Sequence, residues 1–242
     1  MPQLPNALII TPTYNERENV PILIERLHQA VPDAHVLVVD DNSPDQTGDV
    51  VEQLRADHPN LHLLRRAAKQ GLGTAYKDAF TWALERGYRR IVHLDADLSH
   101  PPEVVPQLLA LSEECDLAIG SRYVRGGGVV GWPVNRKIIS RCANFYARTM
   151  LRLPVRDLTA GFMCWRPETL RAIGYETLKA GGYVFLVETK WRTVCMGFRV
   201  RELPIVFKER EKGASKMGLH IAREGFTQVF KWAMGPRPTK SV

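Results

Sequence analysis

The stretch Ile91-Val92-His93-Leu94-Asp95-Ala96-Asp97 places two carboxylates one residue apart, directly after a short apolar run. The run is typical of a buried β-strand, and the following Leu98-Ser99-His100-Pro101-Pro102 is typical of a turn. Asp95 and Asp97 can therefore close on one divalent cation where the strand ends. Hard oxygen ligands of this kind suit Mg²⁺ or Mn²⁺ holding a diphosphate. The alternatives are a solvated turn, or a helix start at which Asp97 is the capping residue.

Short apolar runs alternate with longer helical patterns on both sides of this stretch. The predicted strands are 8–10, 36–39, 61–64, 91–94 and 117–119, and the predicted helices lie near 20–30, 46–55, 72–86 and 104–111. Such alternation predicts the α/β class, with β-α units stacked around a mostly parallel sheet.

Polar clusters follow four of these strands, at 11–16, 40–45, 95–97 and 120–122. Because the carboxyl ends of parallel strands lie along one edge of a sheet, we expect these clusters to face one crevice.

Two of the clusters offer groups for a nucleoside. Asp45 can cap the following helix, whereas the adjacent Asp40 and Asp41 repel each other unless a polar ligand such as a ribose or base uses them. Tyr14 offers a face for a base and Glu16 an acceptor for its N–H groups, although their segment could also be only a turn before a helix.

The second half of the chain has a less regular pattern. We expect a flexible break at 125–128, a helix at 135–151, a turn at 157–162, mixed apolar structure at 183–196 and an apolar segment at 203–207. A charged, glycine-containing loop follows at 208–216.

The last helical pattern has an apolar stripe formed by Leu219, Ala222, Phe226, Val229, Phe230 and Ala233. Two interpretations stay open for it. The stripe can pack on the core, or the helix can rest as a basic amphipathic helix on a membrane surface or dock an anchor protein.

Length and composition are those of one globular domain: 242 residues, of which 45% are hydrophobic and 24% charged. The net charge of +7 predicts an anionic partner, which could be a nucleotide, a phospholipid surface, a phosphorylated lipid or nucleic acid. The 4 cysteines are far apart, which argues against a zinc knuckle or a disulfide framework and favours a reducing compartment. We expect neither a secretory leader nor a transmembrane segment, because the first residues have no basic stretch followed by an apolar one and no apolar run of about 18 residues appears.

Basic residues divide into two predicted groups. Arg122, Arg136, Arg210 and Lys216 are expected to meet phosphate oxygens. Arg65, Arg66, Arg89 and Arg90 are expected to be surface residues that serve solubility.

Taken in order, the motifs resemble a known family. They are Pro12-Thr13-Tyr14-Asn15-Glu16, Val39 to Asp45, Lys69 with Gly71-Leu72-Gly73, Asp95-Ala96-Asp97, Gly120-Ser121-Arg122-Tyr123 and Asp157 to Phe162. This set is similar to glycosyltransferase family 2 and, more narrowly, to the polyprenol-phosphate (dolichol-phosphate) mannosyltransferases. The matches run from about Leu8 to about Lys216.

The resemblance implies a GT-A fold, which is a Rossmann-like, mostly parallel sheet flanked by helices in a single domain. It also implies inverting transfer of mannose from GDP-mannose to a polyprenyl (dolichyl-type) monophosphate, giving a lipid-linked sugar donor. The expected division is a catalytic domain over 1–217 and a C-terminal amphipathic helix and tail over 218–242. That last part either belongs to the same domain or contacts a membrane or partner.

Roles carry over to matching positions as follows. The resemblance implies Pro12, Tyr14, Glu16, Val39 and Asp41 at the guanosine, Asp95, Ala96 and Asp97 at the diphosphate and metal, and Ser99 as a further metal ligand. It implies Arg122, Arg210 and Lys216 at the donor, Arg122 and Arg136 at the acceptor phosphate, and Asp95, Asp97, Arg210 and Lys216 as the catalytic set. Mg²⁺ or Mn²⁺ would be the cofactor. Two residues depart from the family pattern: Ala160 stands where Ser or Gly is common, and Met163 stands where Arg is common.

The implied partners are GDP-mannose, a polyprenyl phosphate and a membrane surface, reached directly or through a separate anchor protein. The expected location is peripheral, at the cytoplasmic face of a membrane. A related transferase using UDP-glucose is the nearest alternative. A basic nucleic-acid-binding module is the alternative from another class, but no helix-turn-helix, zinc-finger or RNP-like pattern accompanies the charge, so we expect no nucleic acid partner.

Overall fold

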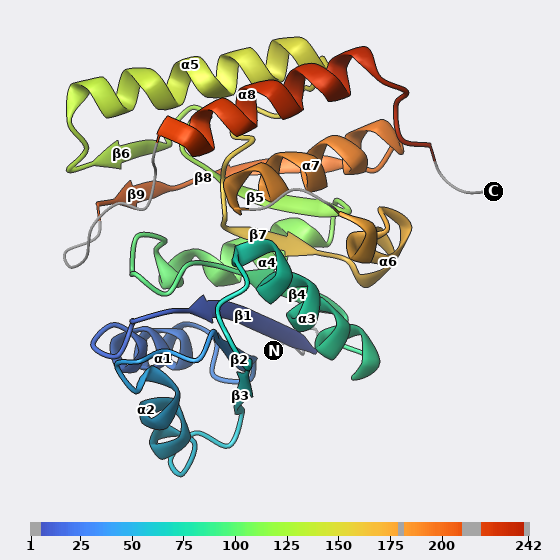
Figure 1. The fold of residues 1–242 in the computed structure, drawn as a ribbon. Coiled ribbons are helices and arrows are strands. Elements are labelled where there is room, and N and C mark those ends of the chain that lie inside the picture. The colour runs from blue at the N-terminus through green and yellow to red at the C-terminus, as the bar shows by residue number, and fades with distance from the viewer. Residues whose placement is uncertain (1–5, 179–181, 210–218, 240–242) are drawn as a thin grey trace.

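A seven-stranded sheet in the order β3-β2-β1-β4-β7-β5-β8 runs through the middle of the protein (Figure 1). The structure is a computed structural model that describes residues 6–178, 182–209 and 219–239. The strands are β1 (Ala7–Thr13), β2 (His35–Asp40), β3 (Leu61–Arg65), β4 (Arg90–His93), β5 (Leu117–Ser121), β7 (Met163–Trp165) and β8 (Val200–Pro204). Only β7 pairs antiparallel, with β4 and β5. The predicted α/β class with a mostly parallel sheet is confirmed.

The helices of the first half begin and end close to their predicted bounds. They are α1 (Val20–Ala30), α2 (Thr47–Leu54), α3 (Leu72–Glu85), the 3₁₀ turn η1 (Pro102–Val104) and α4 (Val105–Ser112). The second half adds α5 (Val134–Leu151), α6 (Pro167–Ala172), η2 (Tyr175–Thr177), α7 (Gly182–Cys195) and α8 (Leu219–Met234).

Two expectations for the second half were incomplete. The break expected at 125–128 leads into β6 (Gly128–Val130), which pairs parallel with β9 (Val206–Lys208). The segment 183–196, for which mixed structure was expected, lies in the helix α7. The sequence did not indicate this helix, because the segment is buried on nearly every side and so lacks a clear apolar stripe.

Both faces of the sheet are buried. Ile9 and Val38 point into a cluster with α1, α2 and α4, whereas their neighbours Ile10 and Val39 point into a second cluster with α3, α6 and α7. Each fully buried side chain of this size contributes roughly 1.5–3 kcal/mol. Covering both faces leaves the strand ends as the places where backbone and polar side chains can meet a ligand.

Helices α5 and α8 form an outer layer beyond α7 (Figure 1). The ring of Tyr146 on α5 lies 4.5 Å from that of Phe226 on α8, and Trp191 on α7 stacks on Trp232 at 5.1 Å. Val229 is buried, but Phe226 and Phe230 are 46% and 54% exposed. The described part of the α8 stripe therefore packs on the core along one side only. No helix in the described ranges is both long and apolar enough to cross a membrane.

Candidate active site

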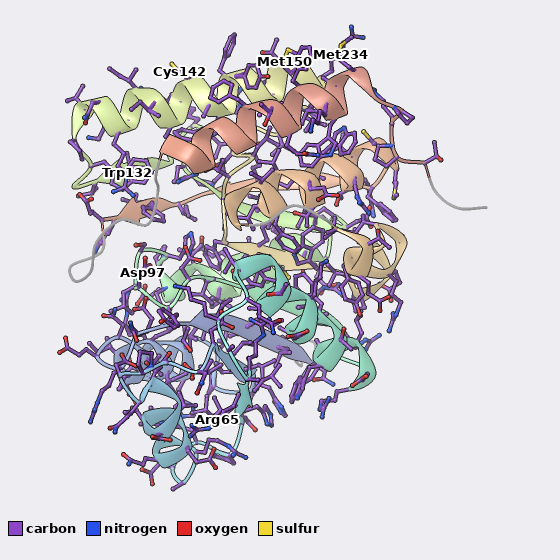
Figure 2. The ribbon with its side chains drawn as sticks, in the orientation of Figure 1. Arg65, Asp97, Trp132, Cys142, Met150 and Met234 are labelled. Carbon is purple, nitrogen blue, oxygen red and sulfur yellow. The ribbon has the colours of Figure 1, made fainter. Side chains whose placement is uncertain are left out.

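The two carboxylates that follow β4 lie in a tight turn at the carboxyl edge of the sheet. Leu98 has a φ of 60°, in the left-handed region, and this lets the chain fold back after Asp97. The Ser99 backbone N–H donates to Asp97 Oδ1 at 3.1 Å, and the Asp95 backbone N–H donates to His100 Nδ1 at 3.1 Å. Figure 2 shows Asp97 on the same side of the molecule as Trp132.

The His100 ring packs inside this turn and is held there by its hydrogen bond with the Asp95 backbone. It is 2% exposed, and burial lowers its pKa, so the ring is neutral at neutral pH. Because Nδ1 accepts the Asp95 N–H, the ring proton is on Nε2. The ring also contacts Phe207 of β9, whose own ring packs against Trp132.

The surroundings of Asp95 and Asp97 fit a divalent cation. Ser99 Oγ is buried and has no hydrogen-bond partner among the described residues. A Cβ at Gly161 would lie 3.5 Å from Asp95 Oδ1, so a larger side chain at 161 would fill the space beside that carboxylate. Within the described ranges, no group of three or more His, Cys, Asp or Glu side chains is arranged to hold a metal. Two carboxylates plus ligands from a diphosphate and water suit Mg²⁺, which keeps few protein ligands.

Asp40 and Asp41 serve different partners, which explains how adjacent carboxylates coexist. Asp40 accepts hydrogen bonds from Thr13 Oγ1 at 3.0 Å and Ser43 Oγ at 2.6 Å, which tie β2 to β1 and close its own loop. Asp41 pairs with Arg66. Burial raises the pKa of the Asp41 carboxyl above its usual range, and the Arg66 pair opposes that rise.

Arg66 was wrongly predicted to be a surface residue. Its side chain is 6% exposed, and it also bonds Asp78 at 2.8 Å and Thr74 Oγ1 at 2.8 Å. Arg90 is likewise mostly covered, since its Nε donates to Ser112 Oγ at 2.8 Å. Sequence reasoning missed both because a basic residue at the end or start of a strand gives no sign of the acidic partner that the fold brings to it.

Tyr14 and Glu16 lie in the loop after β1, beside the Asp40–Asp45 loop. Lys69 Nζ lies 3.7 Å above the centre of the Tyr14 ring. The Glu16 backbone N–H donates to Thr47 Oγ1 at 3.0 Å, and Glu16 Oε2 accepts from Asn19 at 2.7 Å. Pro12 and Val39 are register partners in β1 and β2, and Ala96 is buried between the two aspartates. The predicted nucleoside residues therefore share one edge.

Arg122 is held by a buried ion pair. Its Nε and Nη2 donate to Asp157 Oδ2 and Oδ1 at 2.7 and 2.6 Å, and Nη2 also reaches Thr159 Oγ1 at 2.8 Å. Burial alone would raise the pKa of Asp157, but the Arg122 guanidinium holds it below its usual range. Arg122 thus anchors the 157–161 segment to the end of β5.

Arg136 lies at the start of α5, over the ring of Trp132 at 4.1 Å, and pairs with Glu209 at 2.7 Å. Arg210 and Lys216 lie outside the described residues. The structure therefore brings the aspartates and the aromatic wall formed by His100, Phe207 and Trp132 to one side of the sheet, with Arg122 and Arg136 bordering that wall.

The model of the family described as Glycosyl transferase family 2 matches residues 8–174, which include every one of these strand-end clusters. The chain belongs to glycosyl transferase family 2. Among curated proteins, this glycosyltransferase is 48% identical over 231 residues to an undecaprenyl-phosphate mannosyltransferase of Micrococcus luteus, covering 96% of this chain and 95% of the relative. It is 46% identical over 233 residues to a polyprenol monophosphomannose synthase of Mycolicibacterium smegmatis, covering 96% and 88%.

Solved structures place the glycosyltransferase in the GT-A fold. A mannosyltransferase from Pyrobaculum calidifontis, in complex with GDP-Man and Mn²⁺, matches with a TM-score of 0.62 at 18% identity, covering 98% of this chain and 67% of that one. A glucosyl-3-phosphoglycerate synthase from Mycobacterium tuberculosis, in complex with Mn²⁺ and UDP, matches with a TM-score of 0.67 at 16% identity, covering 95% and 80%. At these identities the likeness concerns the fold.

Lys190 is a buried residue of the glycosyltransferase that sequence reasoning missed. Its Nζ donates to the carbonyls of Ala160 at 2.7 Å, Leu158 at 3.1 Å and Leu186 at 3.2 Å. Burial lowers its pKa to about 7, with Arg122 acting in the same direction and Asp157 opposing. From α7, Lys190 holds the same 157–161 segment that Arg122 holds from β5. A lysine within the apolar segment 183–196 was the signal that the sequence offered.

Proposed function

We propose that this glycosyltransferase transfers mannose from GDP-mannose to a polyprenyl monophosphate with inversion at the anomeric carbon. The observation that carries the proposal is the Asp95–Asp97 turn at the carboxyl edge of a GT-A sheet, in a chain nearly half identical over its length to proteins with polyprenol-phosphate mannosyltransferase names. The product would be a lipid-linked mannose donor.

Asp95, Asp97 and Ser99 are the residues proposed to hold Mg²⁺ or Mn²⁺. When bound, the cation would neutralise charge on the diphosphate of the departing nucleotide. The buried hydroxyl of Ser99, with no partner in the described structure, is the further oxygen this site offers. Ala96 lies between the two ligands, where its small side chain leaves the diphosphate room.

The nucleoside is proposed to lie along the ends of β1 and β2. Tyr14 would stack on the guanine, with Lys69 moving from the Tyr14 ring toward the donor, and Glu16 would accept from the N–H groups of the base. Pro12 and Val39 would line the site. Asp41, with its charge balanced by Arg66, would meet the ribose.

The acceptor needs alignment more than a strong base, because a phosphate monoester is already anionic near neutral pH. Arg136 is proposed to leave its ion pair with Glu209 and bind the acceptor phosphate instead. Arg122, which stays paired with Asp157, is proposed to lie beside that phosphate. Arg210 and Lys216 complete the proposed set at the donor phosphates, where their charge would offset that of the departing GDP.

The enzyme is proposed to work peripherally at the cytoplasmic face of a membrane, where a polyprenyl phosphate resides. Supporting features are the net charge of +7 and the exposed apolar side chains of α5 and α8. A separate membrane protein could anchor it, with residues 218–242 as the proposed contact.

The deciding experiment incubates the purified protein with labelled GDP-mannose, Mg²⁺ and a polyprenyl phosphate. Labelled product that extracts into organic solvent is the expected result. Asp97→Asn should lower the rate by at least 10²-fold, because it removes a charge at the centre of the proposed metal site. Asp57→Asn, which changes an exposed carboxylate in the turn after α2, is the matched control and should leave the rate unchanged.

The same assay tests the donor. Excess unlabelled GDP should inhibit, and UDP should not. Transfer from UDP-glucose with no transfer from GDP-mannose would contradict the proposed donor while leaving the family and fold in place.

A further inference from the structure

A basic pocket of about 350 Å³ lies beside α5, between that helix and the loop after β5. We call it the α5 pocket. Arg122, Arg141, Arg148 and Arg156 line it, together with the aromatic rings of Tyr123 and Phe145. No acidic side chain is among its lining residues in the described structure. Arginine side chains thus line a space of the size of a phosphorylated headgroup, and one of them, Arg122, also borders the proposed acceptor site.

The charges of this pocket are only partly balanced. Arg122 is paired with Asp157, and Arg148 Nε donates to the Leu153 carbonyl at 3.3 Å. The guanidinium groups of Arg141 and Arg156 have neither an ion pair nor a hydrogen bond to any described residue. The excess positive charge favours an anion, and the forked N–H groups of arginine match the oxygens of a phosphate.

The pocket borders an exposed apolar row on α5. Val134, Ile138 and Phe145 are 70%, 56% and 71% exposed, and their spacings of four and seven residues place them on one side of the helix. Arg141 and Arg148 lie beside this row, and α5 contains no acidic residue. Figure 2 shows Cys142, Met150 and Met234 along the outer side of the same α5–α8 layer. Exposed apolar side chains next to arginines are typical of a helix at a membrane interface.

We propose that the α5 pocket binds the phosphate headgroup of an anionic phospholipid, with Val134, Ile138 and Phe145 entering the adjoining acyl boundary. The site rests on Arg141, Arg148 and Arg156, none of which belongs to the proposed transfer site. Lipid binding there does not require that the enzyme use mannose or a polyprenyl phosphate. It would fix the orientation of the protein on the bilayer, because a headgroup held in a pocket defines which helix faces the lipid.

The test compares vesicles of phosphatidylglycerol mixed with phosphatidylcholine against vesicles of phosphatidylcholine alone, by flotation at an ionic strength of about 0.1 M. The wild type should float with the anionic vesicles and not with the neutral ones. Arg141→Gln/Arg156→Gln should weaken that binding about thirty-fold, since each basic residue at an anionic surface contributes about a fivefold factor.

The matched control is Arg89→Gln/Arg171→Gln, which removes the same charge from two exposed arginines before β4 and on α6. It should weaken binding less than about threefold, because loss of net charge away from the contact acts only at long range. If both double variants weakened binding equally, the α5 pocket would not be the binding site, and the attraction would be a diffuse one due to net charge. If the wild type floated equally with neutral vesicles, binding would not depend on an anionic headgroup.

Two soluble probes separate other occupants from the phospholipid. The first probe is inorganic phosphate. If it bound saturably, and Arg141→Gln/Arg156→Gln lost this binding but kept vesicle binding, the pocket would be a site for a free anion and the proposed phospholipid would be wrong. A raised KM for a short, water-soluble polyprenyl phosphate in the same variant would assign the pocket to the acceptor instead. The expected result is an unchanged KM and kcat with the short acceptor, because it is delivered without a membrane.

Discussion

Asp95 and Asp97 differ in exposure although one residue separates them. The Asp95 side chain is 34% exposed, whereas Asp97 as a whole is 6% exposed and accepts a backbone N–H. The turn at Leu98 therefore points one carboxylate toward solvent and holds the other inside. At this scale the site depends on a few buried polar atoms whose partners are fixed. The ion pair of Arg122 with Asp157 and the hydrogen bonds of Lys190 to backbone carbonyls can both be tested by measuring stability.

Removing one member of the buried Arg122–Asp157 pair should be costly. We expect Asp157→Asn to lower the free energy of unfolding by about 3–5 kcal/mol, because the Arg122 guanidinium keeps its burial and loses its charge partner. Urea denaturation followed by circular dichroism measures this. Arg122→Met/Asp157→Leu should recover part of the loss, and a cost below about 1 kcal/mol for the single change would contradict a buried pair.

Lys190 should make stability depend on pH above neutrality. Its pKa is about 7 in the folded protein and near 10.5 when exposed, so the unfolded chain holds more protons between these values. The free energy of unfolding should then rise with pH across that window, by at most about 1.4 kcal/mol per pH unit. Below pH 7 the cost of the buried charge is fully present.

Comparing Lys190→Met with the wild type isolates this contribution, because other groups titrate in both proteins. The stability of the wild type relative to the variant should increase between pH 7 and 9. An unchanged difference across that range would mean that Lys190 keeps its proton in the folded protein.

At the scale of elements, the 157–161 segment joins three of them to the site. Arg122 holds it from the end of β5, Lys190 holds it from α7, and Asn144 on α5 accepts the Leu158 N–H at 2.8 Å. Gly161 then brings the chain beside Asp95. Ala160 and Met163, the two residues that depart from the family pattern, are both buried, so their side chains contribute through packing.

The packing around Gly120 in β5 leaves no room for an added methyl group. A Cβ at Gly120 would lie 2.7 Å from Phe162 Cδ1 and 3.1 Å from Ile205 Cγ2. Gly120→Ala should therefore cost about 1–3 kcal/mol of stability. Gly128→Ala in β6, where nothing lies within 4 Å of the added Cβ, is the control and should change stability little. Thermal unfolding of both variants checks the difference.

At the scale of the whole molecule, loops from distant parts of the chain meet at one edge of a sheet that is buried on both faces. The outer α5–α8 layer lies over α7 and presents exposed apolar side chains. The core therefore supports the site, and the outer layer is available for a surface contact. A ligand at the sheet edge should stabilise the molecule as a unit, since it contacts loops from both halves.

Ligand binding should appear as a shift in Tm. GDP at about a hundred times its Kd, with Mg²⁺ present, should stabilise the protein by about 2.7 kcal/mol, which is a rise of about 5–10 °C for a chain of this length. EDTA should remove most of that rise if the cation joins the diphosphate to Asp95 and Asp97. A shift of equal size with UDP, or one insensitive to EDTA, would contradict the proposed site.

Much of this architecture could be predicted from local pattern. The strands and helices of the first half begin and end near their predicted residues, because apolar periodicity and breakers such as Pro32 and Gly87 act over short distances. The three-residue strand β7 was not predicted, since so short a segment has no period of its own. The helix α7 was not recognised, since burial on nearly every side removes the polar face that marks a helix.

Local sequence alone determined that acidic and hydroxyl-bearing loops follow parallel strands, because apolar alternation sets both the strands and the points where they end. Only the tertiary structure decided which charges stand together: Arg66 with Asp41, Arg122 with Asp157, and Lys190 with the carbonyls of a distant segment. The physical reason is that a buried charge is stable only beside a partner, and that partner can lie anywhere along the chain.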